Sequence, residues 1–371
     1  MLNKIVPITL LTGYLGAGKT TLLNHVLNNK KGLKIAVIVN DIGEINIDAD
    51  LIDKEGVATQ KDENLVPLQN GCICCTLKVD LMRQIIDLCQ TGKYDYILIE
   101  ASGICEPIPI AQTISAIDEL LIEKNLPRMC RLDNVAAVVD ALRLVSEFSC
   151  GGALLDTEKI DEEDIENLLI QQIEFCNVII LNKVDKVTKK QLEEVKAVIR
   201  KLQPQAEIIE TSYSKVDVAK IVNTNYFDFM KASMSAGWIE ELNNPEEEEP
   251  ETDEYGISSF VYKRRKPLDK KKFAQWVNEW PEEVIRCKGF IWFSDEKDMA
   301  YTFEQAGEQI EAAGCGKWLA SGNKREIENL LESNPDVKEA WDKEYGDRIV
   351  KLVFIGQNMN RESIINGLNE C

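Results

Sequence analysis

Several features are scarce or missing in this sequence, and each absence narrows the class of protein. The chain has one histidine, so no histidine-rich metal site can be built from it. Its 43 basic residues are outnumbered by 63 acidic ones, and the formal charge of −20 argues against nucleic acid and anionic membranes as partners. No run of roughly 18 apolar residues occurs, so no membrane-spanning helix is predicted. We therefore expect cations or basic surfaces as partners, with no nucleic acid and no membrane.

The cysteine content bears on the cellular compartment. The chain contains 11 cysteines, an odd number that cannot all pair. The apolar residues behind Lys4 are interrupted by Pro7, and they fit a β-strand better than an export signal. Thiols in a reducing cytosol stay free or hold metal, so we expect a cytoplasmic protein without disulfide bonds.

One stretch near the N-terminus, GYLGAGKT at residues 13–20, matches the phosphate-binding loop pattern. An apolar run precedes it and a helical pattern follows it, which is the strand–loop–helix context that the motif requires. Its glycines let consecutive backbone N–H groups face an anion at a helix N-terminus. The expected nucleotide contacts are Gly13, Gly16, Ala17, Gly18, Lys19, Thr20 and Thr21. In this set Lys19 reaches the β- and γ-phosphates, and Thr20 supplies a hydroxyl for Mg²⁺.

A second motif, Asn182-Lys183-Val184-Asp185, follows the apolar run at 178–181. Asp185 can accept two hydrogen bonds from the N1–H and the exocyclic amine of guanine, and adenine lacks these donors. Asn182 can meet the opposite edge of the base, while the Lys183 stem can cover the ring face. Together with the phosphate loop, this motif predicts GTP as the nucleotide.

Other polar residues follow the ends of predicted strands, where ligands of open α/β sheets bind. Glu100 is placed as the acid on the magnesium side, and the Gly103 N–H is placed to sense the γ-phosphate. Lys19, Glu100 and Gly103 are therefore the catalytic candidates. Ile104 stands where Ras-type enzymes have the glutamine that orients the attacking water, so we expect slow unaided hydrolysis.

Two further loops follow predicted strands and leave alternatives open. In the acidic loop at 40–48, Asp41 and Glu44 either approach magnesium or a second cation, or belong to a solvated loop. The stretch Thr211–Ser214 either closes over the base through Ser212 or is a plain turn. Both loops are candidates because of their position alone.

Three cysteines within four residues form the second informative stretch, Cys72-Ile73-Cys74-Cys75. The thiols of Cys72, Cys74 and Cys75 can converge on one soft metal ion, and zinc or cobalt(II) would be tetrahedral there. The fourth ligand must come from elsewhere in the chain, from water or from a partner. Such an incomplete set suits a protein that hands a metal onward. The alternative is that these cysteines are buried, inert thiols.

The fold class is predicted from residues 1–222, where apolar β-type runs alternate with helical patterns. This alternation is typical of an α/β domain whose mainly parallel sheet is covered by helices. The expected strands are Ile8–Leu11, Ile35–Asn40, Tyr94–Glu100, Val135–Asp140, Val178–Leu181 and Glu207–Glu210. The helical segments between them include Leu77–Cys89 and Lys190–Leu202.

At 371 residues the chain is too long for one ordinary hydrophobic core. An acidic run flanked by prolines, Pro245–Glu251, predicts a solvated linker. We therefore predict a P-loop GTPase domain at 1–240, an acidic linker at 241–255 and a small α+β domain at 256–371. The expected elements of the last domain are strands at 257–262, 284–293 and 348–355 and helices at 269–280 and 361–368.

The motifs occur together in an order that resembles the CobW-like family of P-loop GTPases, and the match spans nearly the whole chain. The residues at 254–262 and 353–356 resemble the opening and the last strand of the family's C-terminal domain. The resemblance implies a GTP-dependent metallochaperone with Cys72, Cys74 and Cys75 as its internal metal site and a client metalloprotein as its partner. Zinc is the commonest proposed cargo, and relatives have been tied to cobalt and iron.

One departure from the family pattern concerns the segment before the C-terminal domain. Many relatives carry a histidine-rich stretch there, whereas this chain has the acidic run Pro245–Glu251. A second hypothesis is a GTPase protein chaperone that gates cobalamin or other cofactor loading, or cobalt or iron insertion, into an enzyme. In that case the cysteines are structural. The oligomeric state stays open.

Overall fold

The computed structural model describes eight stretches of the chain, namely residues 5–28, 32–39, 65–67, 78–148, 165–237, 239, 256–307 and 309–371. The chain divides into two compact units. The first extends to Ala236 and the second begins at Gly237, except that Lys159–Asn167 is grouped with the second. The predicted acidic linker at 241–255 lies outside the described residues. No helix in the described stretches is both long and apolar enough to cross a membrane.

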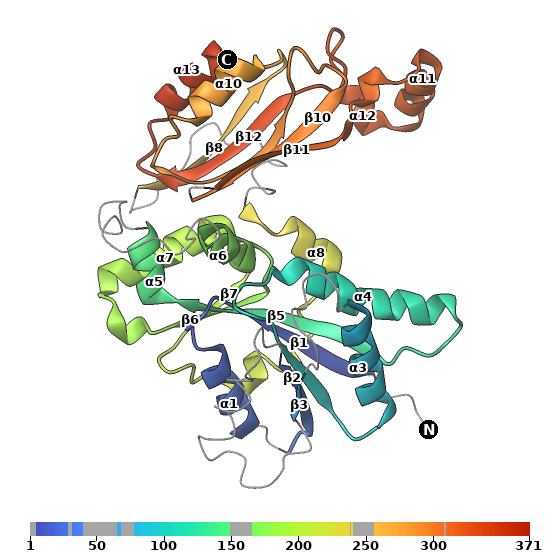
Figure 1. Cartoon of the computed structure of the whole chain (residues 1–371), viewed down its shortest axis with the longest axis vertical. Helices are drawn as coiled ribbons and strands as arrows, with labels where there is room; N and C mark the ends of the chain where they lie inside the picture. The colour runs from blue at the N-terminus through green and yellow to red at the C-terminus, as the bar shows by residue number, and fades with distance from the viewer. Residues whose placement is uncertain are drawn as a thin grey trace. The chain divides into compact units, whose positions relative to one another are not determined.

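The first unit is built on a sheet in which every strand pairing is parallel, in the order β3-β2-β4-β1-β5-β6-β7 (Figure 1). Its strands are β1 (Val6–Thr12), β2 (Ile35–Val39), β3 (Leu65–Pro67), β4 (Tyr96–Glu100), β5 (Cys130–Asp140), β6 (Val178–Asn182) and β7 (Glu207–Glu210). The predicted parallel α/β sheet is thus confirmed. Sequence analysis missed β3, because three residues are too few to show a periodicity.

The strands at the centre of this sheet are apolar without alternation, because both faces are covered. Every residue of β1, β2 and β4 is buried. Helix α1 and the segment 216–222 pack on one face, while α3 and α4 pack together on the other (Figure 1). The helices of this unit are α1 (Lys19–Asn28), α3 (Lys78–Gln90), α4 (Pro107–Glu123), α5 (Ala141–Phe148), α6 (Ile165–Glu174), α7 (Lys189–Leu202) and α8 (Phe229–Met234).

The single histidine of the chain has a structural partner. His25 lies on α1, and its Nε2 is 2.7 Å from the carbonyl oxygen of Val216. This hydrogen bond ties α1 to the segment that packs beside it on the same face of the sheet. The histidine therefore helps to hold the layer under the phosphate loop.

The buried carboxylate of Asp133, on β5, joins this strand to the loop at 224–225, which comes after β7 in the chain. Asp133 is fully buried and accepts hydrogen bonds from the Tyr96 hydroxyl at 2.6 Å and the Thr224 N–H at 2.8 Å. It also accepts from the Asn225 N–H at 2.9 Å and pairs with Arg131 at 2.7 Å. Burial beside the Asp133 charge raises the pKa of the Tyr96 hydroxyl well above its usual range. The phenol therefore stays protonated and keeps donating.

We expect Asp133→Ala to lower the free energy of unfolding by about 3 kcal/mol, because it leaves several buried donors without their acceptor. Urea unfolding followed by circular dichroism measures this change. The matched control is Asp80→Ala, because Asp80 pairs with Arg83 at the surface, where ion pairs contribute less than about 1 kcal/mol. Equal losses of unfolding free energy in the two variants would show that the hydrogen bonds of Asp133 stabilise the protein no more than a surface ion pair does.

The second unit is an antiparallel sheet of five strands in the order β11-β10-β9-β12-β8. Helices α10 and α13 cover one face over an aromatic core that contains Phe273, Phe354 and Trp276 (Figure 1). The elements are β8 (Ile257–Arg264), α10 (Lys270–Val277), β9 (Val284–Ile291), β10 (Met299–Ala306), β11 (Gln309–Lys317), α11 (Lys324–Ser333), α12 (Pro335–Glu339), β12 (Val350–Gln357) and α13 (Arg361–Glu370). The predicted small α+β domain is confirmed.

The dense basic run at 263–266 follows the sheet edge, since β8 is an edge strand. Two of its four side chains are used within the unit. Arg264 donates to the carbonyl oxygen of Leu368 at 2.9 Å, near the end of α13, and Arg265 donates to that of Ala340 at 2.9 Å. These bonds favour a structural role for the two arginines over a contact with an acidic partner.

Candidate nucleotide-binding site

The phosphate loop connects β1 to α1, as the motif requires. Gly13 has φ +135°, and a Cβ there would lie 2.2 Å from the carbonyl oxygen of Val138. Gly18 has φ +112°, and a Cβ there would lie 2.5 Å from the Asn182 Nδ2. Only glycine combines these backbone angles with such close approach. The loop thus presents a narrow backbone cradle at the N-terminus of α1, which is the geometry that fits phosphate groups.

Lys19, the first residue of α1, folds back over this cradle. Its side chain is almost fully buried, and the Nζ donates to the carbonyl oxygens of Gly13 at 2.8 Å and Tyr14 at 3.3 Å. The ammonium group therefore lies at the mouth of the loop, where carbonyl oxygens hold it. A phosphate oxygen is the stronger acceptor that can replace them.

The magnesium side of the predicted site is assembled from two elements. The Thr20 hydroxyl on α1 donates to the Glu100 Oε1 at the end of β4, at 3.3 Å. Glu100 is buried. A hydroxyl and a carboxylate are hard oxygen ligands of the kind that Mg²⁺ prefers, so these residues fit the ion. The structure thus brings together the two residues that the sequence assigned to magnesium.

The turn after β4 lies directly against the phosphate loop. A Cβ on Gly103 would be 2.7 Å from the backbone nitrogen of Leu15, so no larger residue fits there. The Ala101 N–H donates to the carbonyl oxygen of Leu11 at 2.9 Å, which ties the start of this turn to β1. Gly103 is therefore beside the loop where a γ-phosphate would lie.

The base motif reaches the phosphate loop through Asn182 at the end of β6. Its Nδ2 donates to the carbonyl oxygen of Ala17 at 2.8 Å, and its Oδ1 accepts from the Ser214 N–H at 3.0 Å. The Ser214 hydroxyl in turn donates to the carbonyl oxygen of Gly18 at 3.0 Å. In this structure Asn182 therefore links the phosphate loop to the stretch 211–214, and its contact with a base stays a prediction.

Of the neighbouring residues of the motif, Lys183 is half-buried and Asp185 is exposed. Lys183 adopts φ +61°, and its Nζ lies 2.5 Å from the Asp140 Oδ2. The Ser212 side chain forms a hydrogen bond with Asp185 and holds the pKa of that carboxyl below its usual range. Asp185 is thus an ionised acceptor at neutral pH, as recognition of two guanine donors requires. Ser212 lies beside Asp185, while Thr21 and Gly16 are exposed at the loop.

Two residues at this edge were not singled out from the sequence. Asp140 ends β5, pairs with Lys183 and accepts from the Leu142 N–H at 3.0 Å at the start of α5. Arg143 on α5 lies 4.7 Å from the centre of the Tyr14 ring in the phosphate loop. The signal for Asp140 was available, since it is an acid at the carboxyl end of a predicted strand. The Arg143 contact depends on tertiary packing.

Most of the residues predicted to bind metal are not among those described above. Cys72, Cys74, Cys75, Asp41 and Glu44 lie outside the described residues. Within the described stretches, no three Cys, His, Asp or Glu side chains are grouped so that they could hold a metal ion. The cysteine turn therefore stays a prediction. The described helix α3 begins at Lys78, soon after it.

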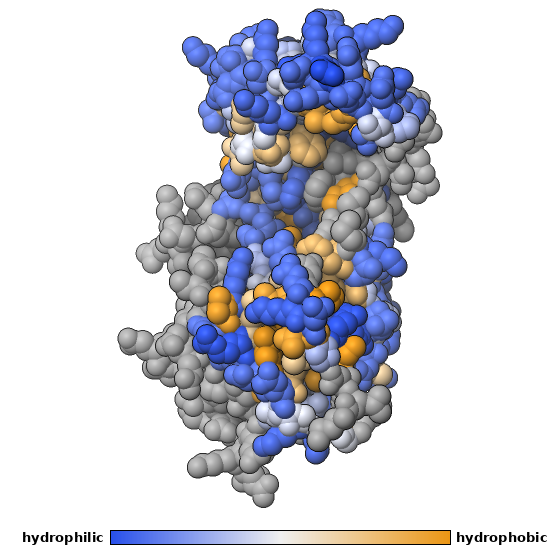
Figure 2. Space-filling view, turned by 90° about the vertical axis from the view of Figure 1, so that its right-hand side faces the viewer, coloured by the Kyte–Doolittle hydropathy of each residue, from blue (hydrophilic) through white to orange (hydrophobic). Residues whose placement is uncertain are grey.

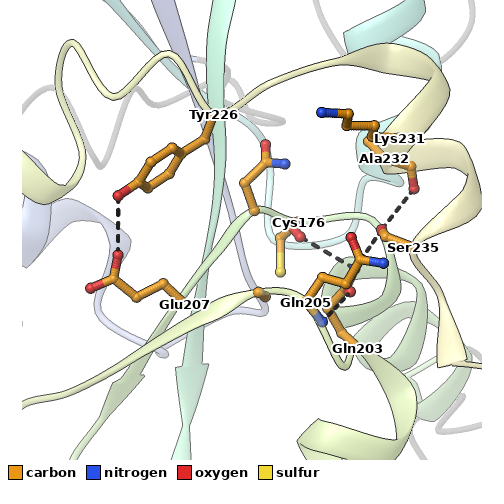
Figure 3. A pocket seen from close by; sticks show the side chains of 10 residues that line it. Cys176, Gln203, Gln205, Glu207, Tyr226, Lys231, Ala232 and Ser235 are labelled. Atoms are coloured by element: carbon orange, nitrogen blue, oxygen red, sulfur yellow. Dashed lines mark hydrogen bonds between the residues drawn. The ribbon is translucent and has the colours of Figure 1, made fainter.

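A cavity of about 280 Å³ lies at the opposite end of the parallel sheet, where β6 and β7 begin (Figure 3). Cys176 and Gln203 line it, and Tyr226 donates to Glu207 at 3.4 Å on one side. Burial raises the pKa of the Cys176 thiol above its usual range, so this cysteine is an inert thiol at neutral pH. The cavity is thus separate from the nucleotide edge and contains no reactive thiolate.

Exposed apolar side chains gather on the face of the first unit that carries α3 and α4 (Figure 2). The most exposed of them on these helices are Val79 and Ile122, at 63% and 61%. Leu126, after the end of α4, is 47% exposed. Exposed apolar residues are ordinary on protein surfaces, so this face carries no assignment.

The fold and the site define a P-loop nucleotide-binding protein with a second, antiparallel domain. A family model described as CobW/HypB/UreG, nucleotide-binding domain, matches residues 7–210. A second, described as the cobalamin synthesis protein cobW C-terminal domain, matches residues 257–371. The chain belongs to the CobW/HypB/UreG family, and the predicted resemblance is confirmed.

Several known proteins are similar to this chain over nearly all of its length. The zinc-regulated GTPase metalloprotein activator 1 of Dictyostelium discoideum is 39% identical over 99% of this chain and 79% of its own length. The zinc chaperone YjiA of Escherichia coli is 30% identical over 97% of this chain and 96% of its own length. The crystal structure of zinc-bound YjiA GTPase covers 99% of this chain and 98% of its own, with 21% identity and a TM-score of 0.43.

Proposed function

We propose that this protein is a GTP-dependent metallochaperone that binds a transition metal, zinc in the first instance, and transfers it to a client protein. The observation that carries the proposal is the convergence at one sheet edge of Lys19, the Thr20–Glu100 pair and the Gly103 turn. These are the parts that a phosphoryl-transfer site needs for phosphate, magnesium and γ-phosphate sensing. The GTPase class predicted from the sequence agrees with the names of the relatives.

The metal part of the proposal rests on Cys72, Cys74 and Cys75 and on the zinc-related names of the relatives. Three thiolates with an open fourth position suit transfer better than storage, because a partner can supply the last ligand. Cobalt(II) fits the same tetrahedron, so zinc and cobalt are both tested. The client is a metalloprotein whose own ligands complete the exchange.

The nucleotide state controls the metal site in this proposal. The Gly103 turn and the acidic loop containing Asp41 and Glu44 contact the γ-phosphate and magnesium, as switch loops do. Ordering of these loops brings the cysteine turn into a metal-holding arrangement. Loss of the γ-phosphate releases the loops and weakens the thiolate site, so that metal affinity follows the nucleotide.

We expect Mg²⁺-GTP to raise the affinity for Zn²⁺ about tenfold over Mg²⁺-GDP, a coupling of ordinary size between two sites. Competition titration of Zn²⁺ and Co²⁺ against a chromophoric chelator measures this, with Cys74→Ser as the variant that removes one thiolate. Cys315→Ser is the matched control, because Cys315 is an exposed free cysteine of the second unit.

Tight one-to-one binding that depends on GTP and is lost only in Cys74→Ser supports the metallochaperone. Weak metal binding whose affinity changes neither with the nucleotide nor with Cys74→Ser contradicts it. That result would favour the second hypothesis, in which the GTPase gates cofactor loading of a client enzyme and the cysteines are structural.

A further inference from the structure

A buried glutamine on α6 holds the turn that follows β4. Gln172 is 1% exposed, and its Nε2 donates to the carbonyl oxygens of Gly103 and Cys105, both at 3.3 Å. The two carbonyls belong to the turn that lies against the phosphate loop. One side-chain amide therefore spans both ends of the Gly103–Cys105 segment.

The orientation of this amide is fixed by its partners. Carbonyl oxygens only accept hydrogen bonds, so the NH₂ group must face them. The Oε1 atom then has no hydrogen-bond partner in the described part of the chain, although it is buried. A buried acceptor without a donor is destabilising, and methionine would fill the same space without it. The two hydrogen bonds to these carbonyls are therefore the reason for an amide, rather than an apolar side chain, at this position.

These carbonyls set the orientation of the peptide groups in the turn. The first anchor of the turn is the bond from the Ala101 N–H to the carbonyl oxygen of Leu11. Gln172 supplies the second anchor at Gly103 and Cys105. With both ends held, Gly103 stays packed against the backbone of Leu15. Its N–H then keeps one direction relative to the phosphate loop.

We propose that Gln172 is a positioning residue for GTP hydrolysis, which acts by holding the Gly103 turn against the phosphate loop. This inference rests on the proposed function, because it presumes that Gly103 senses the γ-phosphate. Gln172 is buried and acts on the turn through the two backbone carbonyls. Its removal therefore lowers turnover more than it lowers nucleotide binding.

The chain offers a matched control in Gln203, which follows α7 and contacts the C-terminal end of α6. Gln203 is fully buried, and its Nε2 donates to the carbonyl oxygens of Glu174 at 2.6 Å and Cys176 at 3.3 Å. Like Gln172, it is a buried glutamine that donates to two backbone carbonyls, but these carbonyls belong to the end of α6 and the residues after it, and the amide also donates to the Ser235 hydroxyl at 2.9 Å. A general loosening of α6 would follow from the loss of either glutamine.

The experiment compares Gln172→Met and Gln203→Met in the full-length protein. Steady-state GTP hydrolysis gives kcat and KM, displacement of a fluorescent GDP analogue gives nucleotide affinity, and thermal melting reports folding. We expect Gln172→Met to lower kcat about tenfold, with KM and GDP affinity changed less than about twofold. Gln203→Met is expected to lower the melting temperature and to leave kcat within about twofold of the parent.

Two outcomes overturn the inference: a kcat of Gln172→Met within twofold of the parent, or an equal loss in Gln203→Met. If Gln172→Met does not fold, Gln172→Glu keeps the shape and replaces the donor with an acceptor, and the same criteria apply. An inactive parent would overturn the proposed function along with this inference. An active parent with an unaffected Gln172→Met would overturn this inference alone.

Discussion

Replacing Lys19 with methionine is expected to lower the kcat for GTP hydrolysis about a thousandfold, because it removes the ammonium group that lies at the mouth of the phosphate loop. The ammonium is held by the carbonyl oxygens of Gly13 and Tyr14, and the side chain is almost fully buried. Charge that develops on the phosphoryl oxygens during transfer would then lose the stabilisation that the ammonium group gives. Methionine keeps the length and apolar stem of the side chain.

Phosphate release measured with Mg²⁺-GTP tests this prediction. Lys196→Met on α7 is the control, because Lys196 pairs with Glu193 at 3.0 Å and Glu210 at 2.9 Å, away from the phosphate loop. Both variants are expected to fold, as thermal melting can show. A Lys19→Met protein that hydrolyses GTP at more than a tenth of the parent rate would remove Lys19 from the catalytic set.

The sequence indicates the nucleotide edge through short local patterns of residues. The glycines at 13 and 18 are required by backbone angles and close approach, so their spacing alone indicates the loop. Buried parallel strands are continuous apolar runs, which is why β1, β2 and β4 are visible without any alignment. Glu100 follows because an acid that closes such a run is seldom there for packing.

The contacts that hold this edge together are less visible. Gln172 lies on a helix whose sequence carries no motif, and its two acceptors are backbone carbonyls 67 and 69 residues away in the chain. Asp140 and Lys183 meet only because β5 and β6 are neighbours in the sheet. Such pairs depend on the order of the strands in the sheet, and the periodicity of apolar residues in the sequence does not predict that order.

In the second unit, β10 and β11 were missed for a different reason. The strand β11 contains the run Ala312-Ala313-Gly314-Cys315-Gly316, and most of its residues are exposed. Small residues without apolar alternation give no strand signal. Pairing with β10 forms this strand, and it is an edge of the sheet with no layer to bury it. The predicted helix at 269–280 carries Phe273, Trp276 and Trp280 at helical spacing, and these side chains pack in the aromatic core.

Asp185→Asn is expected to lower the affinity for GTP about a thousandfold and to make xanthosine triphosphate the preferred nucleotide. Guanine presents two donors, N1–H and the exocyclic amine, and the ionised Asp185 offers two acceptor oxygens. Asparagine offers one acceptor and one donor group. Its NH₂ group would face the exocyclic amine of guanine, and both of these groups are donors. Xanthine has a carbonyl at that position and restores the pairing.

Asp185→Asn is expected to change base recognition without disturbing the fold, because the two side chains are nearly isosteric and the surroundings of Asp185 accept an amide. Ser212 forms a hydrogen bond with Asp185, and its hydroxyl can equally meet an amide. Direct titration with fluorescent analogues of GTP and of xanthosine triphosphate measures the exchange of preference. Asp228→Asn is the control, since Asp228 caps α8 by accepting from the Lys231 N–H at 2.9 Å, and asparagine caps as well. If Asp185→Asn still prefers GTP, the base is bound elsewhere, and the assignment of Asn182–Asp185 to guanine is wrong.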